Sequence, residues 1–170
     1  MGNNFFAYLQ QLELMAFFSG YCLLYAIIIV FAESKAPRNN FKNRIVLVLP
    51  LSYALVATLF LGLQVRNFYS SLNTGVAIHH PFLMIWALLA ILFWIPAFRK
   101  KEWFSLLHSL LFFFMLVKDV IVQIFSSQYI EILKNDMKIY TVSLLLNLAT
   151  FIVMLVFSFV VWQNKKSEKY

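Results

Sequence analysis

Residues 139–162 read IYTVSLLLNLATFIVMLVFSFVVW, and this run decides the fold class of the chain. It contains no Asp, Glu, Lys or Arg. A helix of roughly 20 predominantly apolar residues is long enough to cross the hydrocarbon core of a bilayer. Because unpaired backbone groups are too costly in hydrocarbon, a run of this kind has to be helical rather than an open strand. Residues 139–162 therefore predict a membrane-spanning helix.

Four further, mostly apolar runs precede it, at residues 5–32, 45–67, 81–98 and 103–126. Hydrophobic residues make up 62% of the 170-residue chain, and charged residues make up 12%. Soluble domains carry roughly a quarter charged residues, so this composition excludes a large soluble catalytic domain and a nucleic-acid-binding fold. We predict an all-α integral membrane protein in which five transmembrane helices form an antiparallel bundle. Residues 1–170 then make a single membrane domain, with the lipid bilayer as its main contact.

The positions of the basic residues indicate an orientation. Ten of the 14 Lys and Arg residues follow the first, third and fifth runs: Lys35, Arg38, Lys42, Arg44, Arg99, Lys100, Lys101, Lys165, Lys166 and Lys169. Because cytoplasmic loops of membrane proteins are enriched in Lys and Arg, we expect the N-terminus outside and the C-terminus in the cytoplasm. The expected location is the bacterial inner (cytoplasmic) membrane, crossed several times.

Polar side chains form a stripe on each of the last two predicted helices. At about 100° per residue, Ser105, His108, Asp119 and Gln123 share one face of the helix over 103–126, while Lys118 lies about 80° to the other side of His108. The helix over 139–162 carries Ser143, Asn147, Thr150, Met154 and Ser158 on one face. Since polar side chains hydrogen-bond across membrane helices, we expect the two stripes to meet inside the bundle.

Several of these polar residues are expected at one depth. Glu13, Lys118 and Asn147 each lie eight residues inside a predicted outer helix end, which corresponds to about 12 Å. Gln64, Arg66 and His80 lie closer to the outer surface. The resulting candidate intramembrane cluster comprises Glu13, Gln64, Arg66, His80, Lys118, Asp119, Gln123 and Asn147, and the other polar residues expected to face the bundle are Ser105, His108 and Ser143.

The cluster has a structural and a functional interpretation. In the structural one, Glu13 or Asp119 neutralises Lys118 or Arg66 and thereby fixes the helix register, since charges inside a membrane usually pair. Alternatively, the hydrocarbon segment begins near Met15 and leaves Glu13 at the interface. In the functional interpretation, an outward-facing pocket binds a polar headgroup, a proton or a cation, with Asp119 as the acid and His80 near the mouth.

The residues that usually carry cofactor chemistry are few and scattered. A b-type haem between imidazoles is disfavoured, because His80 and His108 are expected roughly 20 Å apart near opposite membrane faces. The single cysteine, Cys22, allows neither an intramolecular disulfide nor a cysteine-based zinc site. No metal is expected and no catalytic motif is recognised. No cofactor is expected, and a bound lipid is compatible with this composition. Ala16 and Gly20 permit one close approach between helices.

Short loops complete the prediction. Residues 127–138 are expected to form either an ordinary partly solvated loop or one amphipathic turn on the outer surface. With so little soluble chain, the expected function is that of a small non-catalytic subunit or assembly factor of a larger membrane complex, or of a self-associating protein. The alternative is a small outward-opening protein that binds a ligand or conducts protons or ions through the outer polar layer.

Overall fold

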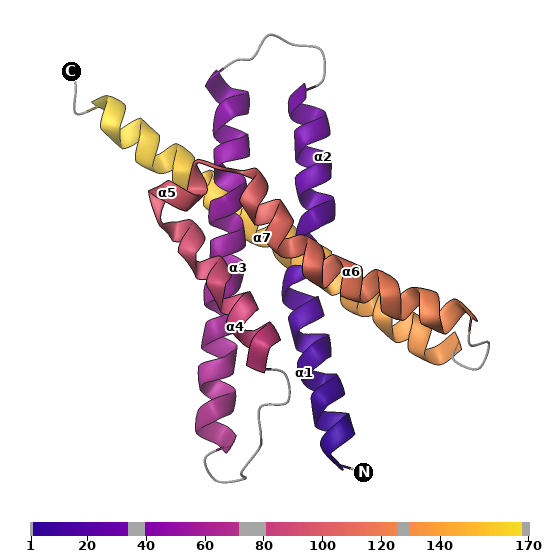
Figure 1. Ribbon diagram of the computed structural model, residues 1–170. Helices are drawn as coiled ribbons and strands as arrows, with labels where there is room; N and C mark the ends of the chain where they lie inside the picture. Colours follow the sequence, from indigo (N-terminus) through magenta and orange to yellow (C-terminus); the bar gives the residue numbers. More distant parts are fainter. Residues whose placement is uncertain (1, 34–39, 72–80, 126–129, 168–170) are drawn as a thin grey trace.

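The computed structural model describes residues 2–33, 40–71, 81–125 and 130–167, and throughout these ranges the chain is helical or turns between helices. No strand occurs in them. The elements, in chain order, are α1 (Gly2–Phe18), α2 (Tyr21–Glu33), α3 (Asn40–Ser71), α4 (Pro81–Leu89), the 3₁₀ helix η1 (Ala90–Trp94), α5 (Pro96–Arg99), α6 (Trp103–Phe125) and α7 (Ile130–Ser167) (Figure 1). The prediction of an all-α fold is confirmed.

Four stretches are long and apolar enough to cross a membrane: Gln10–Val30, Ile45–Tyr69, Trp103–Val122 and Met137–Val161. They coincide with four of the five predicted spans. A helix of this length and composition buries its backbone polar groups within itself, which is the requirement for crossing hydrocarbon. The chain is a multi-pass, membrane-embedded helical protein.

The predicted helix over 81–98 is not a single helix. α4 passes into the 3₁₀ helix η1 at Ala90, Ile95 is extended, and α5 begins with Pro96. Proline lacks the backbone N–H that a helix needs and pushes the preceding residue out of the helical region, which explains the break at Ile95. The apolar helical part, Pro81–Trp94, is shorter than the four long spans. The break falls directly before Pro96, the residue at which a kink or an end of this helix was expected, whereas the change to 3₁₀ geometry at Ala90 was not expected. The fifth crossing stays a prediction.

Two other boundaries differ from expectation. α7 begins at Ile130, so residues 130–138 are helical and continuous with the last span, where a loop or a separate surface turn was expected. The first apolar run is interrupted at Ser19 and Gly20, which separate α1 from α2. A Ser-Gly pair is a frequent cause of such helix breaks.

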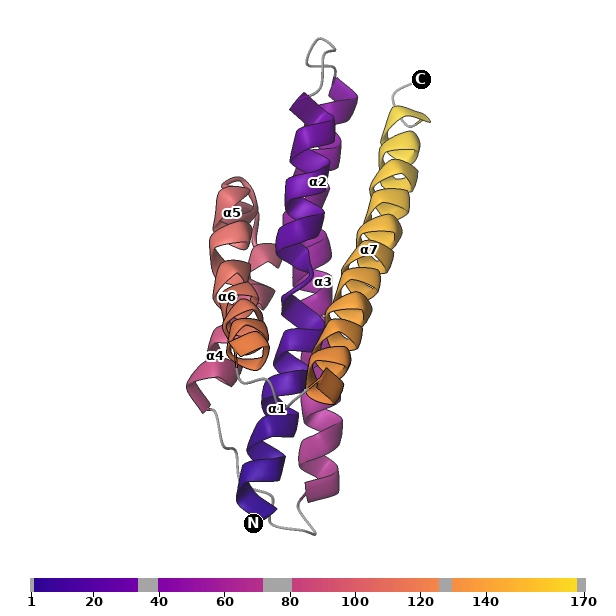
Figure 2. The ribbon, with the colours of Figure 1, turned by 90° about the vertical axis from the view of Figure 1, so that its right-hand side faces the viewer.

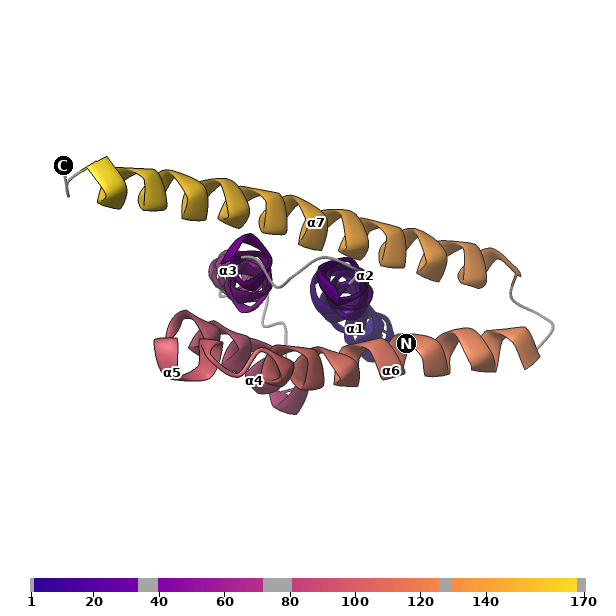
Figure 3. The ribbon, with the colours of Figure 1, turned by 90° about the horizontal axis from the view of Figure 1, so that it is seen from above.

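The helices form three layers rather than a simple bundle. Seen from above, α1–α2 and α3 lie in the middle, α7 runs across one side of them, and α6 runs across the other (Figure 3). α4 and α5 lie on the α6 side (Figure 2). In each of the two spans of the middle layer, 50% of the span is buried inside the protein. The corresponding share is 28% in the span of α6 and 22% in the span of α7. The core is therefore centred on α1–α2 and α3.

Aromatic side chains fill this core. Phe18, at the end of α1, is fully buried and stacks on Phe112 of α6 at a centroid distance of 4.9 Å. It also meets Phe60 of α3 edge to face at 5.3 Å and Tyr53 of α3 at 5.7 Å. Such offset and edge-to-face pairs add to the packing of buried aromatic surface. The Phe18 ring thus joins the middle layer to α6.

The break at Gly20 lets α7 approach the middle layer closely. A Cβ atom at Gly20 would lie 2.5 Å from the backbone nitrogen of Leu144 and 2.7 Å from its Cα. Only a residue without a side chain fits there, and the Gly20 N–H donates a hydrogen bond of 2.9 Å to Ser143 Oγ on α7. The close helix approach predicted at Gly20 is confirmed.

We expect Gly20→Ala to destabilise the protein by about 1–3 kcal/mol, because the added methyl group would push two backbones apart. The matched control is Gly62→Ala on α3, where a Cβ meets nothing within 4 Å. Replacing a helical glycine in open space removes backbone freedom from the unfolded chain, so this variant should be unchanged or up to about 1 kcal/mol more stable. Thermal unfolding of both variants in one detergent measures the difference, and equal melting temperatures would contradict the contact.

Candidate functional site

The predicted polar cluster is divided among several contacts. Near the N-terminal end of the first span, Gln11 Nε2 donates to Asp119 Oδ2 at 2.8 Å and so joins α1 to α6. On α3, Gln64 Nε2 donates to Glu13 Oε2 at 3.1 Å. Both carboxylates are half-buried. Glutamine amides of neighbouring helices therefore contact the two acids that the sequence placed in this layer.

The predicted cations lie elsewhere. Arg66 and Lys118 are exposed, so Glu13 is held by Gln64 and not by either of them. Asn147 contacts the α1–α2 junction instead of the two acids. His80 and the side chain of Gln123 lie outside the described residues, so their predicted roles stay predictions.

The two polar stripes do not meet each other. Ser143 and Asn147 of α7 contact Gly20 and Phe17 in the middle layer. The stripe on α6 faces the middle layer from the opposite side, where α1–α2 and α3 lie between the two helices, and α6 and α7 approach each other only at the C-terminal end of α6 and the N-terminal end of α7 (Figure 3). The expectation that the stripes pair is therefore wrong. The described polar residues of the two stripes contact different surfaces of the same central helices.

At the α1–α2 junction, the Asn147 side chain supplies a hydrogen bond to a backbone carbonyl next to the helix break. Its Nδ2 donates to the Phe17 carbonyl at 2.9 Å and to the Ser143 carbonyl at 2.8 Å. Asn147 is 1% exposed, and its Oδ1 has no hydrogen-bond partner among the described residues. The carbonyls in the last turn of a helix lack intrahelical donors, and an orphan carbonyl in hydrocarbon is costly. The Asn147 amide removes this cost at Phe17 and fixes α7 against the break.

On the other face, His108 of α6 is held at both ring nitrogens. Its Nε2 lies 2.7 Å from the Trp86 carbonyl and its Nδ1 lies 2.9 Å from the Tyr53 hydroxyl. A carbonyl only accepts, so Nε2 carries the proton, and a neutral ring accepts at Nδ1 from the Tyr53 hydroxyl. Trp86 lies in the last turn of α4, directly before the backbone changes to the 3₁₀ helix η1.

Further contacts fix the same imidazole. Its ring is parallel to the Trp86 indole, with an interplanar angle of 4° and a centroid distance of 5.0 Å. The Trp86 Nε1 donates to the His108 carbonyl at 3.3 Å. Trp86 and His108 are thus joined by two hydrogen bonds in opposite directions and one ring stack.

A second set of hydroxyl contacts extends this network to α2. Tyr21 and Ser105 share a hydrogen bond of 2.8 Å, and Cys22 and Ser109 share one of 3.1 Å. The rings of Tyr21 and Tyr53 lie 4.2 Å apart. We refer to Tyr21, Cys22, Tyr53, Trp86, Ser105, His108 and Ser109 as the histidine network. It joins α2, α3, α4 and α6.

The chemistry open to the histidine network is limited by its own hydrogen bonds. Because both imidazole nitrogens are engaged, His108 would have to give up a helix contact before it could bind a metal or accept another proton. Within the described ranges, no group of three or more His, Cys, Asp or Glu side chains is placed to hold a metal ion. The arrangement is suited to positioning helices.

The sequence interpretation found Ser105 and His108 but missed their partners. Tyr21, Tyr53 and Trp86 look like ordinary members of apolar runs. Only a general rule pointed to them. A buried Tyr or Trp needs a hydrogen-bond partner for its polar end, and all three residues lie in predicted membrane spans. The Ser19–Gly20 pair was a more specific sign of the helix break.

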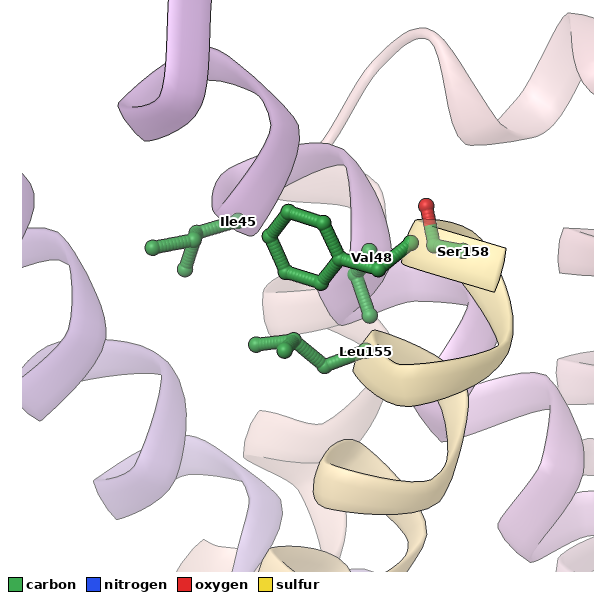
Figure 4. Close-up of a pocket in the computed structure, with 5 residues that line it drawn as sticks. Ile45, Val48, Leu155 and Ser158 are labelled. Atoms are coloured by element: carbon green, nitrogen blue, oxygen red, sulfur yellow. The ribbon is translucent and has the colours of Figure 1, made fainter. Parts of the chain in front are cut away.

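A small hollow lies between α3 and α7, away from the histidine network. Ile45, Val48, Leu155, Ser158 and Phe159 line it (Figure 4). It has room for about one water molecule. Ser158, from the predicted stripe on α7, is the only polar residue in its lining. Its size and apolar lining give it no role in substrate binding.

Comparison with known proteins adds no relative. No protein-family model matches the chain, and no match is found among curated proteins or among solved structures.

We expect Tyr53→Phe to destabilise the protein by about 0.6–2 kcal/mol, because it leaves Nδ1 of the buried His108 without a donor. Tyr25→Phe is the matched control, since the Tyr25 hydroxyl forms no hydrogen bond to another described residue. In the background of His108→Phe, Tyr53→Phe should cost less than in the native chain. Unfolding in detergent measures all four variants, and an equal cost in both backgrounds would show that the hydroxyl does not bind the imidazole.

Proposed function

We propose that this chain is a small non-catalytic subunit or assembly factor of a larger membrane protein complex, located in a bacterial cytoplasmic membrane. The observation that carries the proposal is how the buried polar groups are used. His108, Tyr53, Ser143 and the Asn147 amide nitrogen all hydrogen-bond to other helices of this chain. Polar groups that hydrogen-bond between helices of the same chain position those helices. Contacts with other molecules would then be made by the outer surface of the protein.

The outer surface of α7 supports the second half of this proposal. Along α7, large apolar side chains are exposed every three or four residues, at Val142, Leu145, Leu148, Ile152, Val153, Val156, Phe157, Val160 and Val161. The helix lies obliquely across the middle layer and projects beyond it (Figure 1). Because membrane helices associate through close packing, a further helix on this exposed stripe would complete the packing of α7. The partner is another subunit or a second copy of this chain, and no cofactor is part of the proposal.

The same proposal includes five crossings, with the N-terminus outside. α4 and η1 together span about 24 Å, because a 3₁₀ helix rises about 2.0 Å per residue against about 1.5 Å in an α-helix. The stretched geometry of η1 and the extended Ile95 thus bring this short segment close to the hydrocarbon thickness of about 30 Å. Arg99, Lys100 and Lys101 follow it, which supports a crossing that ends in the cytoplasm.

A second candidate function is supported by Glu13. Its half-buried carboxyl group lies within a membrane span and is held by the neutral Gln64 amide. An amide does not neutralise a carboxylate, so a cation that reaches this group would complete its pairing. This favours the small outward-opening protein that takes up protons or ions as the runner-up.

Single cysteines test the crossings. Native Cys22 is buried and hydrogen-bonded to Ser109, and Cys22→Ala provides the background. A membrane-impermeant maleimide should label Ser71→Cys in intact cells, whereas Lys100→Cys and Ser167→Cys should react only after permeabilisation. Labelling of all three positions in intact cells would mean that α4, η1 and α5 return to the outer side without crossing. Labelling of Lys100→Cys and Ser167→Cys, but not of Ser71→Cys, would mean that the orientation is reversed.

Site-specific photo-crosslinking tests the subunit function. A photoreactive residue at Val153 on α7, which is 57% exposed, should give a single discrete protein adduct in native membranes. The matched position is Ile85 on α4, which is 61% exposed and should give lipid adducts. If both positions give only lipid adducts and the purified chain carries a proton or ion flux in liposomes that Glu13→Gln abolishes, the runner-up is correct and the subunit proposal is wrong.

A further inference from the structure

Lys118 lies on the exposed face of α6. The residues four before it and three, four and seven after it share this face and are apolar: Phe114 is 63% exposed, Ile121 47%, Val122 56% and Phe125 84%. The neighbouring Asp119 turns to the other side and accepts from Gln11. Lys118 was expected inside the polar layer. The structure instead places it among side chains that face away from the protein, which overturns the expected position.

The ammonium group of Lys118 forms no ion pair within the described part of the chain. A cation on an apolar membrane face is costly unless it reaches an anion or water. Lys118 lies seven residues before Phe125, the last residue of α6, which corresponds to about 10 Å along the axis. A lysine side chain extends its ammonium group towards this helix end, where it meets water and headgroups, while its methylene groups stay in hydrocarbon.

We propose that Lys118 binds the phosphodiester group of an anionic membrane lipid, in the leaflet at the C-terminal end of α6. Phosphate oxygens occupy the interface that the ammonium group reaches, and a charge-assisted hydrogen bond to a phosphate is strong. The acyl chains lie along Phe114, Ile121 and Val122. Anionic headgroups bind better than zwitterionic ones, because no second cation competes with the lysine for the phosphate.

A lipid is favoured over a carboxylate of a protein partner by the surroundings of Lys118. Lys118 is an exposed cation whose ammonium group extends towards the membrane interface, where the phosphates of lipid headgroups lie. Bulky apolar side chains around a single cation match one charged headgroup with its acyl chains. The site is independent of the partner proposed for α7.

Native mass spectrometry of the full chain in neutral detergent tests the proposal. The probes are phosphatidylglycerol, phosphatidylcholine and free glycerol phosphate. We expect tighter binding of phosphatidylglycerol than of phosphatidylcholine, and about five-fold weaker phosphatidylglycerol binding by Lys118→Gln. Lys118→Arg should retain binding because it keeps the cation. Lys138→Gln is the matched control, since Lys138 is also an exposed lysine, located at the start of the last span.

Three results would overturn the proposal. Equal binding by Lys118→Gln and the native chain, or equal losses in Lys118→Gln and Lys138→Gln, would mean that Lys118 forms no site of its own. Displacement of the lipid by free glycerol phosphate at equal concentration would point to a soluble phosphate. A photoreactive residue at Phe114 that forms protein adducts and no lipid adducts would assign the face to a partner. Since Lys118 is exposed, unchanged melting temperatures should accompany the loss of binding.

Discussion

The backbone contact between Gly20 and Leu144 is the constraint on which the rest of the structure depends. It exists because the first apolar run breaks at Ser19 and Gly20 and because glycine carries no side chain at the point where α7 passes. Asn147 and Ser143 then supply the hydrogen bonds that a continuous helix would have made for itself. A bulkier residue at position 20 would separate α7 from the middle layer and leave polar groups of the break unsatisfied in hydrocarbon.

The histidine network has the corresponding role on the opposite face. His108 connects α6 to α4 through the Trp86 carbonyl and to α3 through the Tyr53 hydroxyl. Both faces of the middle layer are thus fixed by a few directional contacts, while the aromatic core around Phe18 fills the space between them. In a membrane the hydrophobic effect does not drive helices together, so such polar contacts and close packing decide how the layers are arranged.

Much of the fold could be predicted from the sequence, because long apolar runs in a bilayer have few alternatives to helices. The close approach at Gly20 was also predictable, since glycine is the residue that permits it. The partners of the polar stripes were not predictable. A stripe shows which side of a helix is polar, but it does not show whether the polar side of α7 meets α6 or the central helices. The helical periodicity correctly put Lys118 and Asp119 on different faces of α6. The expected depth of Lys118 in the membrane, taken alone, wrongly put its side chain inside the polar layer.

Solid-state NMR of the full chain in lipid bilayers can detect the close approach of α7 to the α1–α2 break, because it measures short distances between backbone atoms. Selective labelling of glycine and leucine isolates the contact between Gly20 and Leu144. A through-space cross-peak between their backbone atoms is expected, and it should disappear in Gly20→Ala. A spectrum in which Gly20 shows cross-peaks only to α1 and α2, with none to α7, would contradict it.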